Sequence, residues 1–72
     1  MRHHWWHDPG NDYYAVAVED GRIVSAWLQV GPHEWEALDD FLPLQAADAR
    51  GEIHRNPHGY TDSLGPSRGA VQ

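Results

Sequence analysis

The chain has 72 residues, of which 40% are hydrophobic and 22% are charged, a mixture typical of one small folded domain. Five arginines against 11 acidic residues give a net charge of −6, which disfavours direct binding to a nucleic-acid backbone. Cysteine is absent, which excludes disulfides and thiolate zinc sites. The apolar runs are too short for a membrane span, and residues 1–8 lack the apolar stretch of a signal peptide. We therefore expect no membrane association and a cytoplasmic location. All five basic residues are arginines, which indicates a GC-rich genome and hence a bacterial or phage source, so the cytoplasm is that of a bacterial host.

Residues 2–7 (Arg-His-His-Trp-Trp-His) come before a dense cluster of turn residues at positions 8–12. This order predicts a first strand that runs antiparallel to the segment beginning at Tyr13. A hairpin of two strands is only marginally stable in water, so a third strand or a covering helix is required.

The clearest local pattern is a β-hairpin centred on Asp20-Gly21, a dipeptide that suits a type I′ turn. Segments rich in β-branched and aromatic residues flank it on both sides. With this dipeptide as the loop, Tyr14 pairs with Trp27 on one face of the hairpin. Small side chains occupy the other face: Ala15, Ala17, Val24 and Ala26.

A helix is predicted between Pro32 and Pro43, because proline suits the first turn of a helix and a second proline ends it. Its apolar side chains recur every three or four residues, at Trp35, Leu38 and Phe41 or Leu42. We expect this stripe to pack on the small-residue face of the hairpin. The segment 44–50 is either another short helix or one arm of a second hairpin that closes through residues 52–54.

From Asn56 onward the chain has no periodic apolar pattern, which predicts a loop-rich or disordered tail over residues 56–72. The working domain is then residues 1–55. The predicted fold is α+β: a small antiparallel meander of two to three strands, one helix on a face, and a loose C-terminal tail.

Histidines provide the only pattern that suggests a metal. His3 and His7 are four residues apart, a spacing that zinc sites use on helices, and His4 lies between them. No further pair of ligands follows at a recognisable spacing, and a turn begins at once. We interpret these histidines as polar strand residues and predict neither a metal site nor a cofactor.

Catalytic patterns are equally sparse. Glu34, Glu36, Asp39 and Asp40 fall on the exposed side of the predicted helix, where acidic residues are usually solvated. No serine has the sequence context of a nucleophile, and so short a chain has little room to enclose both a core and a pocket. We predict that the chain is not an enzyme.

Tryptophan is unusually frequent, with four in 72 residues, and it often anchors interfaces. One predicted helix can cover only one face of the sheet, so the other face is expected to carry an exposed aromatic patch. The residues assigned to this patch are Tyr14, Val16, Trp27, Trp5 and Trp6. The patch predicts binding to a partner protein or formation of a homodimer.

These patterns together predict a non-enzymatic interaction module, such as a small acidic bacterial or phage regulator or inhibitor of a larger protein. The larger protein could belong to a host-defence or transcription complex. The acidic residues Glu34, Glu36, Asp39 and Asp40 would occupy a basic groove that normally takes nucleic acid. A structural subunit of a virion or multiprotein complex and a histidine-based metal-binding protein are the alternatives.

Overall fold

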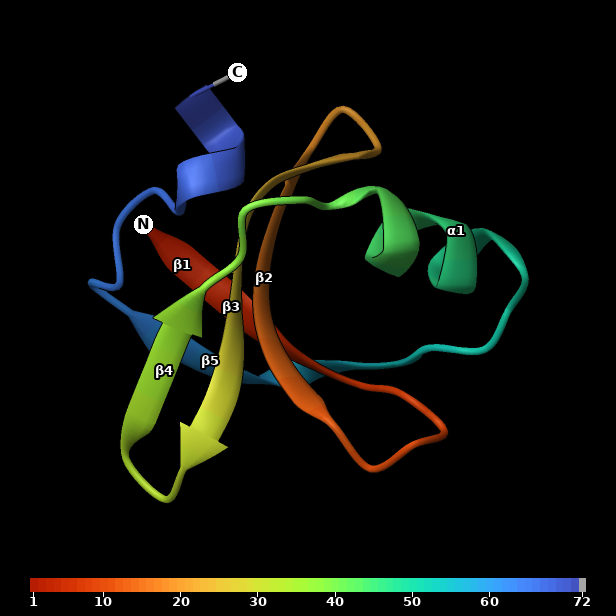
Figure 1. Cartoon of the computed structure of the whole chain (residues 1–72), viewed down its shortest axis with the longest axis horizontal. Coiled ribbons are helices and arrows are strands. Elements are labelled where there is room, and N and C mark those ends of the chain that lie inside the picture. The colour runs from red at the N-terminus through yellow and green to blue at the C-terminus, as the bar shows by residue number, and fades with distance from the viewer. Residues whose placement is uncertain (72) are drawn as a thin grey trace.

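The computed structural model describes residues 1–71, and the side chains of residues 1–69. The elements in chain order are β1 (Arg2–His7), β2 (Tyr13–Glu19), β3 (Arg22–Gly31), β4 (Glu34–Ala37), α1 (Leu42–Ala49), β5 (His54–Asp62) and the 3₁₀ helix η1 (Arg68–Val71). The strands form one open antiparallel sheet in the order β4-β3-β2-β1-β5 (Figure 1). The predicted α+β class is confirmed, but the sheet has five strands rather than two to three. In the described part of the chain, no helix is long and apolar enough to cross a membrane.

The β2–β3 hairpin turns at Asp20-Gly21 as predicted. Both residues have a positive φ, 52° and 77°, which a type I′ turn requires at its two central positions. Glycine adopts this conformation without steric cost, and aspartate is among the residues that tolerate it.

The register of this hairpin differs from the prediction because β3 contains a bulge. Val18 opposes Ile23, but the next pair joins Ala17 to Ser25, so one residue of β3 is extra. Trp27 consequently opposes Ala15 instead of Tyr14. Since side chains alternate along a strand, this slip of one residue moves Trp27 to the face opposite Tyr14.

The prediction of a helix between Pro32 and Pro43 is wrong. Residues 34–37 form strand β4, in which Trp35 opposes Gln29 of β3, and the helix begins only at Leu42. Proline fits the first turn of a helix and the corner of a tight turn equally well. Pro32 makes the turn between β3 and β4, while Pro43 lies in the first turn of α1. Of the two alternatives left open for residues 44–50, the helix is the one observed.

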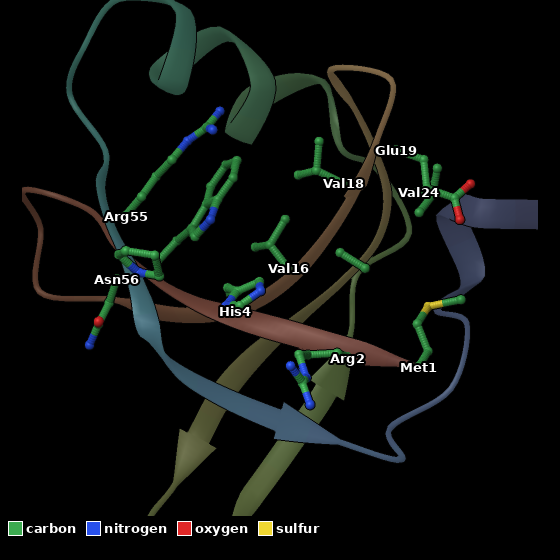
Figure 2. A pocket seen from close by; sticks show the side chains of 12 residues that line it. Met1, Arg2, His4, Val16, Val18, Glu19, Val24, Arg55 and Asn56 are labelled. Carbon is green, nitrogen blue, oxygen red and sulfur yellow. The ribbon is translucent and has the colours of Figure 1, made fainter.

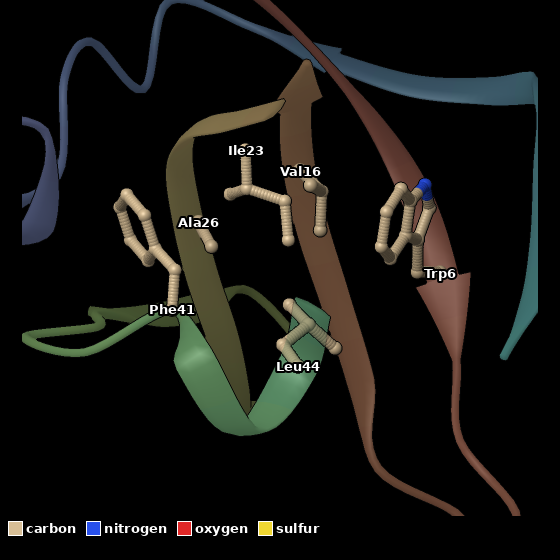
Figure 3. Close-up of a cluster of buried hydrophobic side chains, with 6 residues drawn as sticks. All are labelled: Trp6, Val16, Ile23, Ala26, Phe41 and Leu44. Carbon is tan, nitrogen blue, oxygen red and sulfur yellow. The ribbon is translucent and has the colours of Figure 1, made fainter. Parts of the chain in front are cut away.

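The hydrophobic core lies between α1 and one face of the sheet, which we call the α1 side (Figure 3). Its buried members are Trp6, Val16, Ile23, Ala26, Phe41 and Leu44. The predicted packing of the helix over Ala15 and Ala17 is therefore wrong, because both alternate with Val16 and face the far side. The α1 side carries the larger apolar side chains, so covering it removes more apolar surface from water.

Residues 54–62, most of which were assigned to a loose tail, form β5 and pair with β1. An insertion interrupts the pairing: His4 opposes Tyr60, whereas Trp5 opposes Asn56. The Asn56 side-chain oxygen accepts the backbone N–H groups of His58 and Gly59, both at 3.1 Å, and so closes a turn inside the strand. This insertion breaks the alternation by which a strand is recognised in a sequence.

Beyond β5, the C-terminal segment (residues 63–69) is anchored to the sheet by the buried hydroxyl of Ser25. That oxygen accepts the N–H of Ser67 at 2.9 Å, donates to the Gly65 carbonyl at 3.2 Å, and lies 2.8 Å from His3 Nε2. A hydroxyl has one proton, so His3 Nε2–H is the donor in the third bond. Ser67 in turn accepts the N–H of Ala26 at 2.9 Å. The tail is thus packed against β3 through its described residues, and residue 72 lies outside them.

Candidate functional site

The far side of the sheet carries a row of side chains from four strands. Trp5 comes from β1, Tyr13 from β2, Gln29 from β3 and Trp35 from β4, and we call these four residues the aromatic face. The register explains why they meet: Trp5 and Trp27 both oppose Ala15. Tyr13 and Gln29 lie two residues from those positions and therefore point the same way.

Three aromatic rings and one amide surround a hollow of about 160 Å³. Trp5 and Tyr13 remain 41% and 48% exposed, a large fraction for aromatic side chains of a sheet. Trp35 and Gln29 are partly buried. The hollow is open to solvent and large enough for one side chain of a partner.

Contacts outside the hollow hold two of its rings in place. The indole N–H of Trp5 donates to Thr61 Oγ1 at 2.8 Å. The ring of Tyr13 stacks on His7, with the ring centroids 4.4 Å apart and an interplanar angle of 14°. Gly59 packs under Trp5 so closely that an added Cβ would lie 2.7 Å from Trp5 Cε3. The rings are therefore positioned before any partner binds.

The five residues predicted to form one aromatic patch are divided between the two faces of the sheet. Trp6 and Val16 are 3% and 1% exposed and belong to the core on the α1 side. Trp27 lies on the far side, partly buried, and its indole N–H donates to the Gly65 carbonyl at 3.2 Å. Trp5 alone of the five belongs to the aromatic face.

Tyr14, the remaining member of the predicted patch, packs against the core on the α1 side. Its hydroxyl donates to Asp8 Oδ2 at 3.0 Å. Burial, together with the hydrogen bond to this carboxylate, raises the pKa of Tyr14 to about 12. Tyr14 therefore stays protonated and fastens the β1–β2 turn to the sheet.

The four predicted acidic binding residues do not share a helix face. Glu34 and Glu36 lie on β4, where they alternate with Trp35 and point away from the aromatic face. Asp39 contacts the Arg68 guanidinium at 3.4 Å, and Asp40 accepts the N–H of Leu42 at 3.0 Å at the start of α1. All four are exposed.

The histidines of β1 occupy three different environments. His3 is fully buried on the far side and bonded to Ser25, and burial lowers its pKa from 6.5. His4 faces the α1 side, and His7 is stacked on Tyr13. Over residues 1–71, no group of three or more histidine and acidic side chains is placed to hold a metal ion.

Tyr13, Gln29 and Trp35 are the members of the aromatic face that the sequence-based prediction missed. Trp35 was assigned to a helix, and the predicted register placed Tyr13 on the face to be covered by that helix. The signal was present in Gly31-Pro32-His33, a tight turn that returns the chain antiparallel to β3 and starts a new strand.

Comparison with known proteins gives no family: the chain matches no protein-family model, no curated protein and no solved structure at a significant level.

Proposed function

We propose that the chain is a protein-interaction module whose aromatic face receives a cationic side chain of a basic partner protein. The observation that carries this proposal is the hollow lined by Trp5, Tyr13 and Trp35. The faces of aromatic rings have negative electrostatic potential and attract the guanidinium of arginine or the ammonium of lysine. Several rings around one hollow provide such a cation with more than one face.

The charge of the chain supports a basic partner. At a net charge of −6, the chain attracts cationic surfaces over a long range and steers their approach. The acidic residues Glu34 and Glu36 lie on either side of Trp35 on the short edge strand, and although their side chains point to the other face they add to the negative potential of this edge. Two copies of this chain repel one another, so a different protein suits the surface better than a second copy.

The proposed action is occlusion of the partner's basic surface. A basic surface on a larger protein commonly serves an acidic ligand such as nucleic acid, and an acidic module bound there competes with that ligand. The module would then be a regulator or inhibitor. Under this proposal the chain contacts the partner protein and not the nucleic acid itself.

Site-specific photo-cross-linking tests the proposal. One variant carries the photoreactive residue p-benzoylphenylalanine in place of Trp35, and a matched control carries it in place of Leu42 on α1, which is 71% exposed. In cells of the source organism, the probe at 35 should give a defined adduct with a larger basic protein, and the probe at 42 should not. Equal adducts from the two positions, or none from position 35, would contradict the proposal.

A further inference from the structure

A second surface, on the opposite side of the sheet, has the features of a small-molecule site. Helix α1 has only eight residues and leaves part of the α1 side of the sheet uncovered. The uncovered part is a groove of about 660 Å³, which is within the range of typical ligand pockets, about 300–1,000 Å³. It is independent of the aromatic face because the two lie on opposite faces of the same strands.

The floor of the groove is apolar. Val16 and Val18 of β2 project from one strand, Trp6 of β1 lies beside them, and Val24 lines the same cavity. Val18 is 39% exposed although it points to the same side as the core. The groove follows β1 from Arg2 to Trp6, about 13 Å at the usual rise of about 3.3 Å per residue. An extended hydrocarbon chain fits this shape.

Polar groups are concentrated on one wall. His4 lies between Arg55 and Met1, which mark opposite ends of the groove (Figure 2). The Nδ1 atom of His4 is itself buried, so this side chain contributes the surface of its ring to the wall.

Arg55 stands over the end of the groove nearest α1. Its guanidinium lies 4.5 Å from the centroid of the Trp6 ring, and its Nε and Nη2 donate to the carboxylate of Asp48 at 3.0 and 2.5 Å. A guanidinium has five N–H donors, so this ion pair leaves donors for another carboxylate. Arg55 is held rigidly by the two contacts and is oriented before a ligand arrives.

Two of the five arginines, Arg2 and Arg55, line the groove, whereas Glu19 is the one carboxylate in its lining. Each arginine is also paired with a carboxylate outside this lining, Arg2 with Asp62 at 3.5 Å and Arg55 with Asp48. The N–H donors of Arg55 that Asp48 does not use are therefore the polar groups available to a ligand. We infer that the groove binds an amphipathic carboxylate, with the hydrocarbon part on the valine floor and the carboxylate beside the free N–H donors of Arg55. A cationic or neutral apolar molecule would lack a partner for these donors.

Titration with octanoate, followed by amide chemical shifts, tests this inference, with octanol as the neutral control of equal chain length. Octanoate should give saturable shifts at Val16, Val18 and His4, and octanol should bind at least about tenfold more weakly, the factor expected for loss of one charge-assisted hydrogen bond. Equal affinity for the two probes would overturn the assignment to a carboxylate. The absence of saturable shifts at these residues would overturn the site itself.

A pair of variants at Val18 separates ligand binding from a general change in the fold. Val18→Asp places a negative charge in the groove and should weaken octanoate binding at least about tenfold, whereas Val18→Lys should retain it. Both substitutions remove the same exposed apolar side chain, so the difference between them reports the charge. Equal affinities in the two variants would contradict the proposed orientation of the carboxylate.

Discussion

Replacing Ser25 with alanine should release the C-terminal segment, residues 63–69, from the sheet. The Ser25 hydroxyl is fully buried and takes part in three hydrogen bonds, with His3, Gly65 and Ser67. The substitution therefore removes the junction of β1, β3 and the end of the chain.

The expected cost follows from the groups that lose their partner. In Ser25→Ala, the buried Nε2–H of His3 and the N–H of Ser67 are both left unpaired, and each such group costs about 1–3 kcal/mol. Water can reach Ser67 once the segment detaches, so we expect a total loss of about 3 kcal/mol. A domain of this size has about 4–11 kcal/mol of stability, at about 0.05–0.15 kcal/mol per residue, and so the sheet remains folded.

Urea unfolding and amide hydrogen exchange measure the two parts of this prediction. The free energy of unfolding should fall by about 3 kcal/mol, and the amides of Ser67 and Gly69 should lose protection while those of β2 keep it. Val30→Ala, at an exposed position of the same strand, is the control and should change stability by less than about 0.5 kcal/mol. Unchanged protection of the Ser67 and Gly69 amides in Ser25→Ala would refute the assignment of this hydroxyl as the anchor of the segment.

Three further predictions concern pH, the Trp5 ring and metal. Burial lowers the pKa of His3 in the folded state, so at pH values near 6.5 the unfolded chain binds more protons than the folded chain. The free energy of unfolding should therefore fall as the pH drops below about 6.5, and a free energy that stays constant as the pH is lowered through this range would contradict the prediction. Gly59→Ala should push the Trp5 ring aside, cost about 1–3 kcal/mol and alter tryptophan fluorescence, and an unchanged emission spectrum would show that the ring has not moved. A strong chelator should leave the melting temperature unchanged, and destabilisation that added zinc reverses would reveal a structural metal.

The hairpin at Asp20-Gly21 could be predicted because its signal is local: two residues that accept a positive φ between two β-rich segments. The bulge in β3 could not be predicted from the sequence, because it depends on which side chains the sheet must bury. Without the extra residue, Ile23 and Ala26 would not both face the core, although each suits a strand in either register. Local preference therefore identified the hairpin but not the face of each side chain.

Strand β4 and strand β5 were missed for different physical reasons. In β4, Trp35 falls at a spacing that fits a helix with Leu38, and only pairing with β3 selects the strand. In β5, the turn closed by Asn56 interrupts the alternation, and its pairing partner lies about fifty residues earlier in the chain. Pairing between distant segments leaves little trace in the composition of either one.

The aromatic face was anticipated as a kind of surface but not as a set of residues. An excess of tryptophan over what one helix can cover predicted exposed rings on one face of the sheet. The slip in register moved Trp27 away from the face of Tyr14, and α1 covers that face, so Tyr14 packs against the core. Of the predicted patch, only Trp5 lies on the aromatic face. The identity of the other members required the position of β4.

The affinity of the cross-linked partner for matched variants tests the central claim most directly. Calorimetric titration would compare the unmodified chain with Tyr13→Ala, which removes one wall of the hollow, and with Leu42→Ala, which removes an exposed side chain on α1. The account predicts that Tyr13→Ala weakens binding by about 2 kcal/mol, roughly thirtyfold, and that Leu42→Ala leaves the affinity unchanged. Equal affinities for Tyr13→Ala and the unmodified chain, with both proteins folded, would contradict it.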